Sequence, residues 1–214
     1  MTARVRVLCI DGGLADMGWI VATVHDDATV HLHGAGVVHT TPTKTGKVPG
    51  SAVQLGTSVS ADSMRRAVEV AGVINRALRL HDPRHDDGEA PPLVVAIEAF
   101  TPPRGAAGAA LKVGFGIGAA LSAAVSHRPA DADSMCIAQA TAAEVKRLLR
   151  VPAGLDEGAS KAAVRAAVHA RFPVLADMLS GVPNGRREHA YDAAGVLLAC
   201  IDRDRFVQVM PMRT

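Results

Sequence analysis

The chain has 214 residues, of which 49% are apolar and only 3% aromatic, and 23 basic against 21 acidic side chains give a formal net charge of +2. This length is typical of one domain, so we expect residues 1–214 to fold as a single unit with a core of Ala, Val, Leu and Ile. The balanced charge excludes a uniformly basic protein, so any nucleic-acid surface has to be a local patch.

The strands are predicted by apolar, β-branched runs. Runs at 4–13, 17–25 and 29–40 are separated by turn residues and predict an antiparallel meander of three strands. Further apolar runs at 93–100 and 134–140 predict two more strands. We therefore expect a mixed α/β sheet with helices on its faces.

The clearest helical pattern covers residues 60–81, where apolar residues recur at helical spacing. The core-facing residues are expected to be Met64, Val68, Ala71, Ile74 and Leu78. Arg65, Arg66 and Glu69 fall on another face. Further helices are expected at 105–125, 141–150, 161–172 and from residue 187 onward, with 151–160 as a loop.

The cysteines and the apolar segments indicate the compartment. Cys9, Cys136 and Cys200 lie in separate apolar runs without zinc-ligand spacing, as reduced core thiols of a cytoplasmic protein do. The N-terminal segment has no signal-peptide pattern. Segment 105–125 is apolar, but it contains Lys112 and no aromatic anchors, so we expect no membrane partner.

Four ionisable residues form the candidate site. Asp11 and Glu98 end the first and fourth predicted strands, although singly each is also explained as a turn former or a surface residue. His189 and Asp192 lie three apart on one helix face, where acids also complement the helix dipole. Together the four would repel one another without cations, and such an oxygen-rich set suits Mg²⁺, with two ions stabilising a phosphoryl displacement.

Five segments carry a resemblance to a known family. They are "IDGGLADMG", "AIEAF", "AAEVKRLL", "GASKAAVRAAV" and "HAYDAAGVLLA", in this order along the chain. Taken together they resemble the RuvC-type Holliday-junction resolvases, with Asp-Gly-Gly in place of the usual Asp-Pro-Gly. The resemblance implies a ribonuclease H-like five-stranded mixed sheet, three strands antiparallel and two parallel, with helices on both faces.

The resemblance also implies a function and a ligand set. It implies a structure-selective endonuclease that resolves four-way DNA junctions in recombination and repair, in the cytoplasm with the nucleoid. The catalytic and metal-binding residues would be Asp11, Glu98, His189 and Asp192. Two Mg²⁺ ions are expected, with Mn²⁺ as a substitute; Asp11 would bridge them, and His189 would bind near the second ion or assist proton transfer.

Further residues are expected to contact the DNA. Lys146 and Lys161 match the family's DNA- and phosphate-contacting lysines, although a solvated helix face also explains them. Arg104 and Lys112 would extend the basic track. Phe100 is the candidate for the family's aromatic wedge, and it follows Glu98 more closely than that wedge does.

The helix at 105–125 is rich in glycine, and each glycine costs about 1 kcal/mol of helix propensity relative to alanine. Close approach of a second helix would offset this cost, and the equivalent helix forms the homodimer interface of resolvases. A two-fold homodimer also suits symmetric cleavage of a four-way junction. The alternative is close packing of this helix on the protein's own sheet.

Three other functions stay open at this point. The chain could be another ribonuclease H-like nuclease that acts on RNA or RNA–DNA hybrids, or a catalytically inactive junction-binding protein. The third alternative is that the chain is half of a sugar kinase or of an actin-like ATPase, because those folds also begin with a strand followed by Asp-x-Gly.

Overall fold

The computed structural model describes residues 4–43, 47, 58–81, 92–99, 107–127 and 135–202. Its centre is a five-stranded sheet in the order β3-β2-β1-β4-β5. The strands are β1 (Arg4–Gly12), β2 (Asp16–His25), β3 (Val30–His39), β4 (Leu93–Glu98) and β5 (Cys136–Ala140). The first three strands pair antiparallel, whereas β4 pairs parallel with β1 and with β5. This arrangement confirms the predicted sheet.

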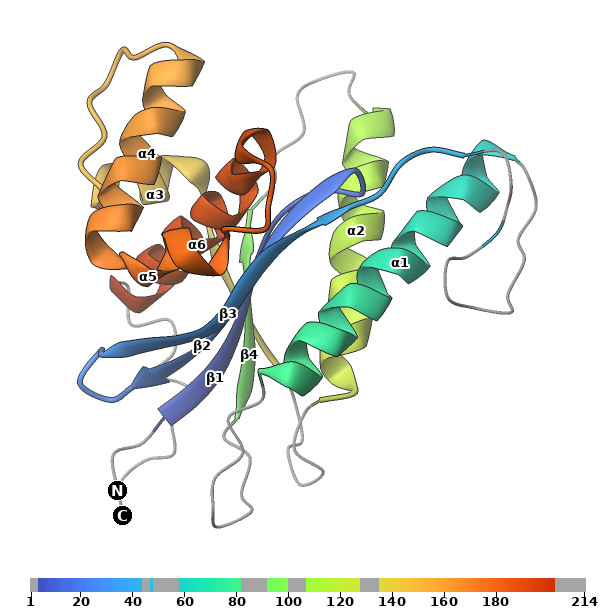
Figure 1. The fold of residues 1–214 in the computed structure, drawn as a ribbon, viewed down its shortest axis with the longest axis horizontal. Helices are drawn as coiled ribbons and strands as arrows, with labels where there is room; N and C mark the ends of the chain where they lie inside the picture. Colours follow the sequence, from blue (N-terminus) through green and yellow to red (C-terminus); the bar gives the residue numbers. More distant parts are fainter. Residues whose placement is uncertain are drawn as a thin grey trace.

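Helices cover both faces of the sheet (Figure 1). One face carries α1 (Val59–Leu80) and α2 (Ala107–Val125). The other carries α3 (Ala142–Leu148), α4 (Glu157–Arg171), α5 (Val174–Met178) and α6 (Arg187–Asp202), which the 3₁₀ turn Asn184–Arg186 precedes.

Alternation along β1 separates the two cores. Leu8 and Ile10 pack with the cluster under α1 and α2, while Val7 and Cys9 pack with the cluster under α3–α6. All four side chains are almost completely buried. Cys9 and Cys200 are buried free thiols, and Cys136 is half-buried and also free.

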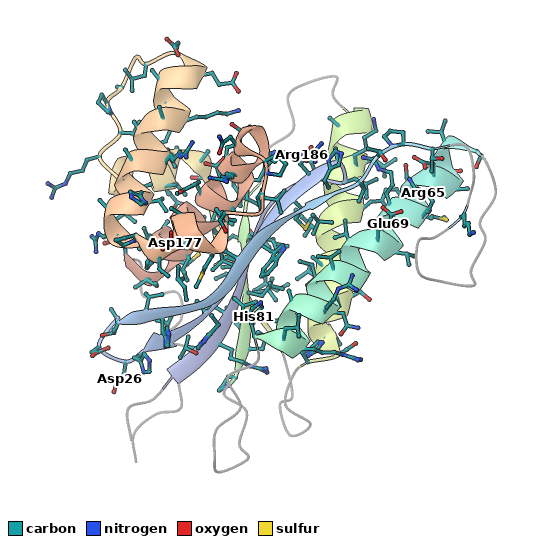
Figure 2. The ribbon with its side chains drawn as sticks, viewed as in Figure 1. Asp26, Arg65, Glu69, His81, Asp177 and Arg186 are labelled. Atoms are coloured by element: carbon teal, nitrogen blue, oxygen red, sulfur yellow. The ribbon has the colours of Figure 1, made fainter. Side chains whose placement is uncertain are left out.

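The predicted core face of α1 was partly wrong. Met64 and Val68 are 51% and 47% exposed, whereas Arg65 and Arg66 are buried. Arg65 donates hydrogen bonds to Asp62, Glu69 and the backbone carbonyl of Thr41. Figure 2 shows Arg65 and Glu69 near each other on α1. Arg66 donates hydrogen bonds to the hydroxyl and carbonyl oxygens of Thr40. The chain that leaves β3 thus supplies acceptors which satisfy two buried guanidinium groups.

Two local expectations on the other face also need correction. The segment 151–160 is not entirely loop, because Asp156 accepts a hydrogen bond from the Ala159 backbone N–H and starts α4 at Glu157. The short helix α5 was not predicted. Five residues give too little periodicity to be recognised in a sequence.

The glycine-rich helix α2 packs on its own sheet at one glycine. A Cβ atom at Gly116 would lie 2.9 Å from the backbone carbon of Gly13. Gly108, Gly114 and Gly118 have open space where their side chains would be. By length and composition α2 is also the one helix in the described ranges that could cross a membrane, a test that core helices pass as well.

Candidate active site

The ends of β1 and β4 bring two carboxylates to one edge of the sheet. The parallel register pairs Ile10 with Ile97, so the next residues, Asp11 and Glu98, are adjacent in the two strands. Asp11 is 7% exposed, and its carboxylate is therefore held largely out of water. The structure thus brings together two of the residues that the sequence assigns to one site.

The first turn of α6 brings His189 and Asp192 to the same edge. The Nδ1 atom of His189 lies 3.5 Å from Oδ2 of Asp11, across 178 residues of sequence. Gly18 of β2, which pairs with Asp11, allows this approach. A Cβ atom there would lie 2.0 Å from the carbonyl oxygen of His189, so only glycine lets the helix backbone rest on the strand.

Asp11, Glu98, His189 and Asp192 all line one pocket of about 510 Å³. The α2 side chains of Val113 and Ile117 form its apolar wall. The remaining lining residues are Ile10, Gly12, Gly13, Ala99, Thr141, Ala142, Ala143, Lys161 and Glu188. The structure thus places the four predicted site residues around a single cavity.

The pocket disfavours the simultaneous ionisation of its carboxyl groups. Burial, a hydrogen bond with Asp11 and the nearby negative charges raise the pKa of Glu98 to about 9. Burial and the charge of Asp11 raise the pKa of Asp192 to about 7. The pKa of His189 is raised, chiefly by its hydrogen bond to Asp11. The two carboxyl shifts arise first from burial and then from neighbouring negative charge, and the shift of His189 arises from its contact with Asp11.

The donor chemistry of the pocket fits hard divalent cations. Three carboxyl groups offer the oxygen ligands that Mg²⁺ prefers, and the imidazole of His189 adds a nitrogen. In the described part of the chain, however, no group of three or more His, Cys, Asp or Glu side chains has the mutual spacing of a formed metal site. The four residues share the pocket wall without forming a coordination shell, and their assignment as metal ligands stays a prediction.

Two of the predicted DNA-contacting lysines lie at this site. Lys161 lines the pocket and forms ion pairs with Glu157 at 3.0 Å and Glu188 at 3.4 Å. Lys146 lines an adjoining cavity of about 210 Å³ together with Glu98, Asp192 and Lys161. Both ammonium groups therefore stand beside the carboxylates.

The structure does not place the other predicted DNA-contacting residues at the pocket. Lys112 is exposed on α2 and does not line the pocket. Phe100 and Arg104 lie outside the described residues. Their roles as wedge and basic track stay predictions.

Two pocket residues and one backbone contact beside the pocket were not among the predicted site residues. Glu188 lines the pocket beside His189, and Thr141 lines it directly after the end of β5. Thr141 had a signal in the sequence, because its capping box with Glu144 marks a helix start directly after a strand. The contact of Gly18 with α6 had none, because it depends on a tertiary approach.

The comparisons with known proteins find similar solved structures. No protein-family model matches the chain, and no curated protein matches it. RuvC of Thermus thermophilus in complex with a Holliday junction substrate is 20% identical with a TM-score of 0.57, over 97% of this chain and 99% of that one. A second Thermus thermophilus RuvC structure is 20% identical with a TM-score of 0.54, over 96% and 98%.

The yeast mitochondrial Holliday junction resolvase Ydc2 is 10% identical with a TM-score of 0.45, over 95% of this chain and 82% of that one. The two Thermus comparisons extend over almost the whole of both chains. The chain has the ribonuclease H-like fold of the RuvC resolvases, with a mixed five-stranded sheet between two helical layers.

Proposed function

We propose that the protein is a structure-selective endonuclease that resolves four-way DNA junctions by phosphodiester hydrolysis. The observation that carries the proposal is the gathering of Asp11, Glu98, His189 and Asp192 around one pocket in a RuvC-type fold. This substrate would place the protein with the nucleoid in the cytoplasm, in recombination and repair.

In the proposed reaction a water oxygen attacks the phosphorus and one P–O ester bond breaks. Asp11, Glu98 and Asp192 are the residues that would hold two Mg²⁺ ions, or Mn²⁺ in their place. When bound, these ions supply electrostatic stabilisation of the attacking and leaving oxygens. His189 orients the Asp11 carboxylate through its Nδ1 atom, 3.5 Å from Oδ2 of Asp11, which leaves the other ring nitrogen, Nε2, to accept or return a proton.

The lysines around the pocket suit the phosphate of the substrate. Lys146 and Lys161 place positive charge beside Glu98 and Asp192, at the mouth between α3, α4 and α6. Phosphate contacts of this kind position a nucleic acid without reading its sequence. Selectivity would then come from the shape and deformability of the junction.

We also propose that the protein acts as a homodimer through α2. The outward side chain of Leu111 is 62% exposed. Gly108, Gly114 and Gly118 present open backbone on the same helix. The opposite face of α2, with Val113 and Ile117, lines the pocket. A partner helix against the open face would offset the helix-propensity cost of its glycines and pair two sites about a two-fold axis.

The test compares three proteins on a synthetic mobile four-way junction with Mg²⁺. The wild type should make symmetric paired nicks, and Asp192→Asn should abolish them while junction binding persists. Asp177→Asn is the matched control, because Asp177 is an exposed acid on α5 and does not line the pocket.

A parallel reaction on an RNA–DNA hybrid separates the nuclease classes. Cleavage of the hybrid alone would replace the proposal with a ribonuclease H activity. Nicks that survive Asp192→Asn would overturn the site assignment, and tight binding without cleavage by the wild type would indicate an inactive junction-binding protein.

A further inference from the structure

Helix α4 carries a basic side chain at every fourth position over three successive turns. Its sequence from residue 161 is "KAAVRAAVHAR", so Lys161, Arg165 and His169 recur at intervals of four. Residues four apart stand above one another on a helix, and all three side chains are exposed. We name this line of Lys161, Arg165 and His169 the α4 ridge.

The buried and the small residues of α4 fall on separate lines. The line that packs inward consists of Ser160, Val164 and Val168. The line next to the ridge consists of Gly158, Ala162, Ala166 and Ala170, all exposed. Small side chains there leave the three basic groups standing above a flat strip, so an extended partner can lie along the helix without obstruction.

The α4 ridge begins at the candidate active site and contacts α6, the helix that carries His189 and Asp192. Lys161 lines the pocket. The guanidinium carbon of Arg165 lies 5.2 Å from the centre of the Tyr191 ring, a cation–π geometry. Tyr191 is buried and directly precedes Asp192. The position of Arg165 is therefore fixed relative to the pocket.

The outer part of the ridge is electrostatically available. Lys161 is paired with Glu157 and Glu188. Within the described ranges, neither Arg165 nor His169 forms an ion pair with a carboxylate. Arginine and imidazole N–H groups are good donors to phosphate oxygens.

We propose that the α4 ridge binds the phosphate backbone of a duplex DNA arm as it leaves the cleavage pocket. This inference rests on the proposed junction-resolving function and specifies how that substrate is held. From Lys161 to Arg165 to His169 the ridge runs about 12 Å, at about 1.5 Å per helical residue. That length corresponds to between three and four base-pair steps of about 3.4 Å. The ridge thus follows the backbone and contributes affinity without sequence preference.

The test measures the salt dependence of junction binding in EDTA, where no cleavage occurs, by fluorescence anisotropy. Each lost phosphate contact should lower the slope of log Kd against log salt by about 0.9. We expect that reduction for Arg165→Ala, a further reduction when His169→Ala is added at pH 6, and recovery of most of the slope in Arg165→Lys. Binding by Arg165→Ala should be several-fold weaker at low salt.

The matched control is Arg76→Ala, which removes an exposed arginine from α1 on the opposite face of the sheet. Its slope should equal that of the wild type. His169→Ala alone removes an exposed side chain and leaves the contact between Arg165 and Tyr191 in place, so it tests the ridge even if Arg165→Ala destabilises the protein.

Wild-type slopes in both Arg165→Ala and His169→Ala would overturn the ridge and leave the proposed function intact if the wild type still cleaves junctions. Failure of the wild type to bind a junction at all would overturn both. If Arg76→Ala lowered the salt-dependence slope as much as Arg165→Ala does, the effect would be one of net charge, and the ridge would also be rejected.

Discussion

The backbone of His189 rests directly on Gly18, where an added Cβ atom would lie 2.0 Å from the histidine carbonyl oxygen. Gly18 is the cross-strand partner of Asp11, so this contact places the first turn of α6 over the strand end that carries the carboxylate. On the opposite face, Gly116 of α2 rests on Gly13, in the turn between β1 and β2. The end of β1 is therefore held between two helices.

Gly18→Ala should destabilise the protein by about 3 kcal/mol, because the new methyl group overlaps backbone atoms that cannot move independently. Urea unfolding measures this change. The control is Gly72→Ala on exposed α1, where a Cβ meets nothing within 4 Å and alanine should add up to about 1 kcal/mol of stability. Equal stabilities of the two variants would contradict the close approach of α6.

Without metal, the stability of the protein should fall as the pH rises from 4 towards 9. The folded pKa values of about 9 for Glu98 and about 7 for Asp192 lie above the value near 4 of an unfolded carboxyl group. Between these values the folded state holds protons that the unfolded chain has lost, so the free energy of unfolding decreases with pH.

The raised pKa of His189 acts in the same direction, because the stabilisation by its proton is present at low pH and lost as the pH rises through the folded pKa. Urea unfolding in EDTA across this pH range is the measurement. Asp192→Asn and Glu98→Gln should flatten the curve, and the exposed-site variant Asp177→Asn should leave it unchanged. A wild-type curve that rises with pH would contradict the proposed environment.

Mg²⁺ should raise the Tm of the wild type at pH 8, because a ligand that binds only the folded state stabilises it. The rise should be smaller at pH 6, where metal binding must displace a proton from Asp192 (pKa about 7) in addition to the proton that Glu98 (pKa about 9) holds at both pH values. Differential scanning calorimetry with millimolar Mg²⁺ or Mn²⁺ tests both statements. An undiminished shift in Asp192→Asn would exclude that residue as a ligand.

Gly118→Arg should convert the proposed dimer to a monomer, because Gly118 faces open space on α2 and a long charged side chain there would block a partner helix. Sedimentation velocity gives the oligomeric state. Gly72→Arg on α1 is the matched control and should leave the dimer intact. A monomeric wild type at micromolar concentration, or a dimeric Gly118→Arg, would reject α2 as the interface.

Arg65→Ala should destabilise the protein by about 3 kcal/mol, because it removes the buried partner of Asp62 and Glu69. Met64→Ala should cost less than about 1 kcal/mol, since the side chain is 51% exposed. Chemical denaturation of the two variants checks this order. A larger loss of stability for Met64→Ala than for Arg65→Ala would instead support the buried face of α1 that the sequence pattern predicts.

Much of the fold could be predicted because it depends on local patterns. Alternating and apolar runs located the five strands, and the spacing of apolar residues located most helices. Asp11 and Glu98 were recognisable because a carboxylate that ends a buried strand is unusual, and parallel pairing of those strands brings such ends together. His189 and Asp192 were recognisable as one rung at the start of an apolar helix.

The sequence by itself determined which residues share a strand end or a helix face, because these relationships follow from backbone geometry a few residues long. Only the tertiary structure decided which face of α1 is buried, since the acceptors for Arg65 and Arg66 come from residues 40 and 41, far along the chain. It also decided that α6 rests on Gly18 and that Arg165 lies over Tyr191. Such contacts depend on distances between separate elements. The packing of the whole core sets these distances, and no local sequence pattern encodes them.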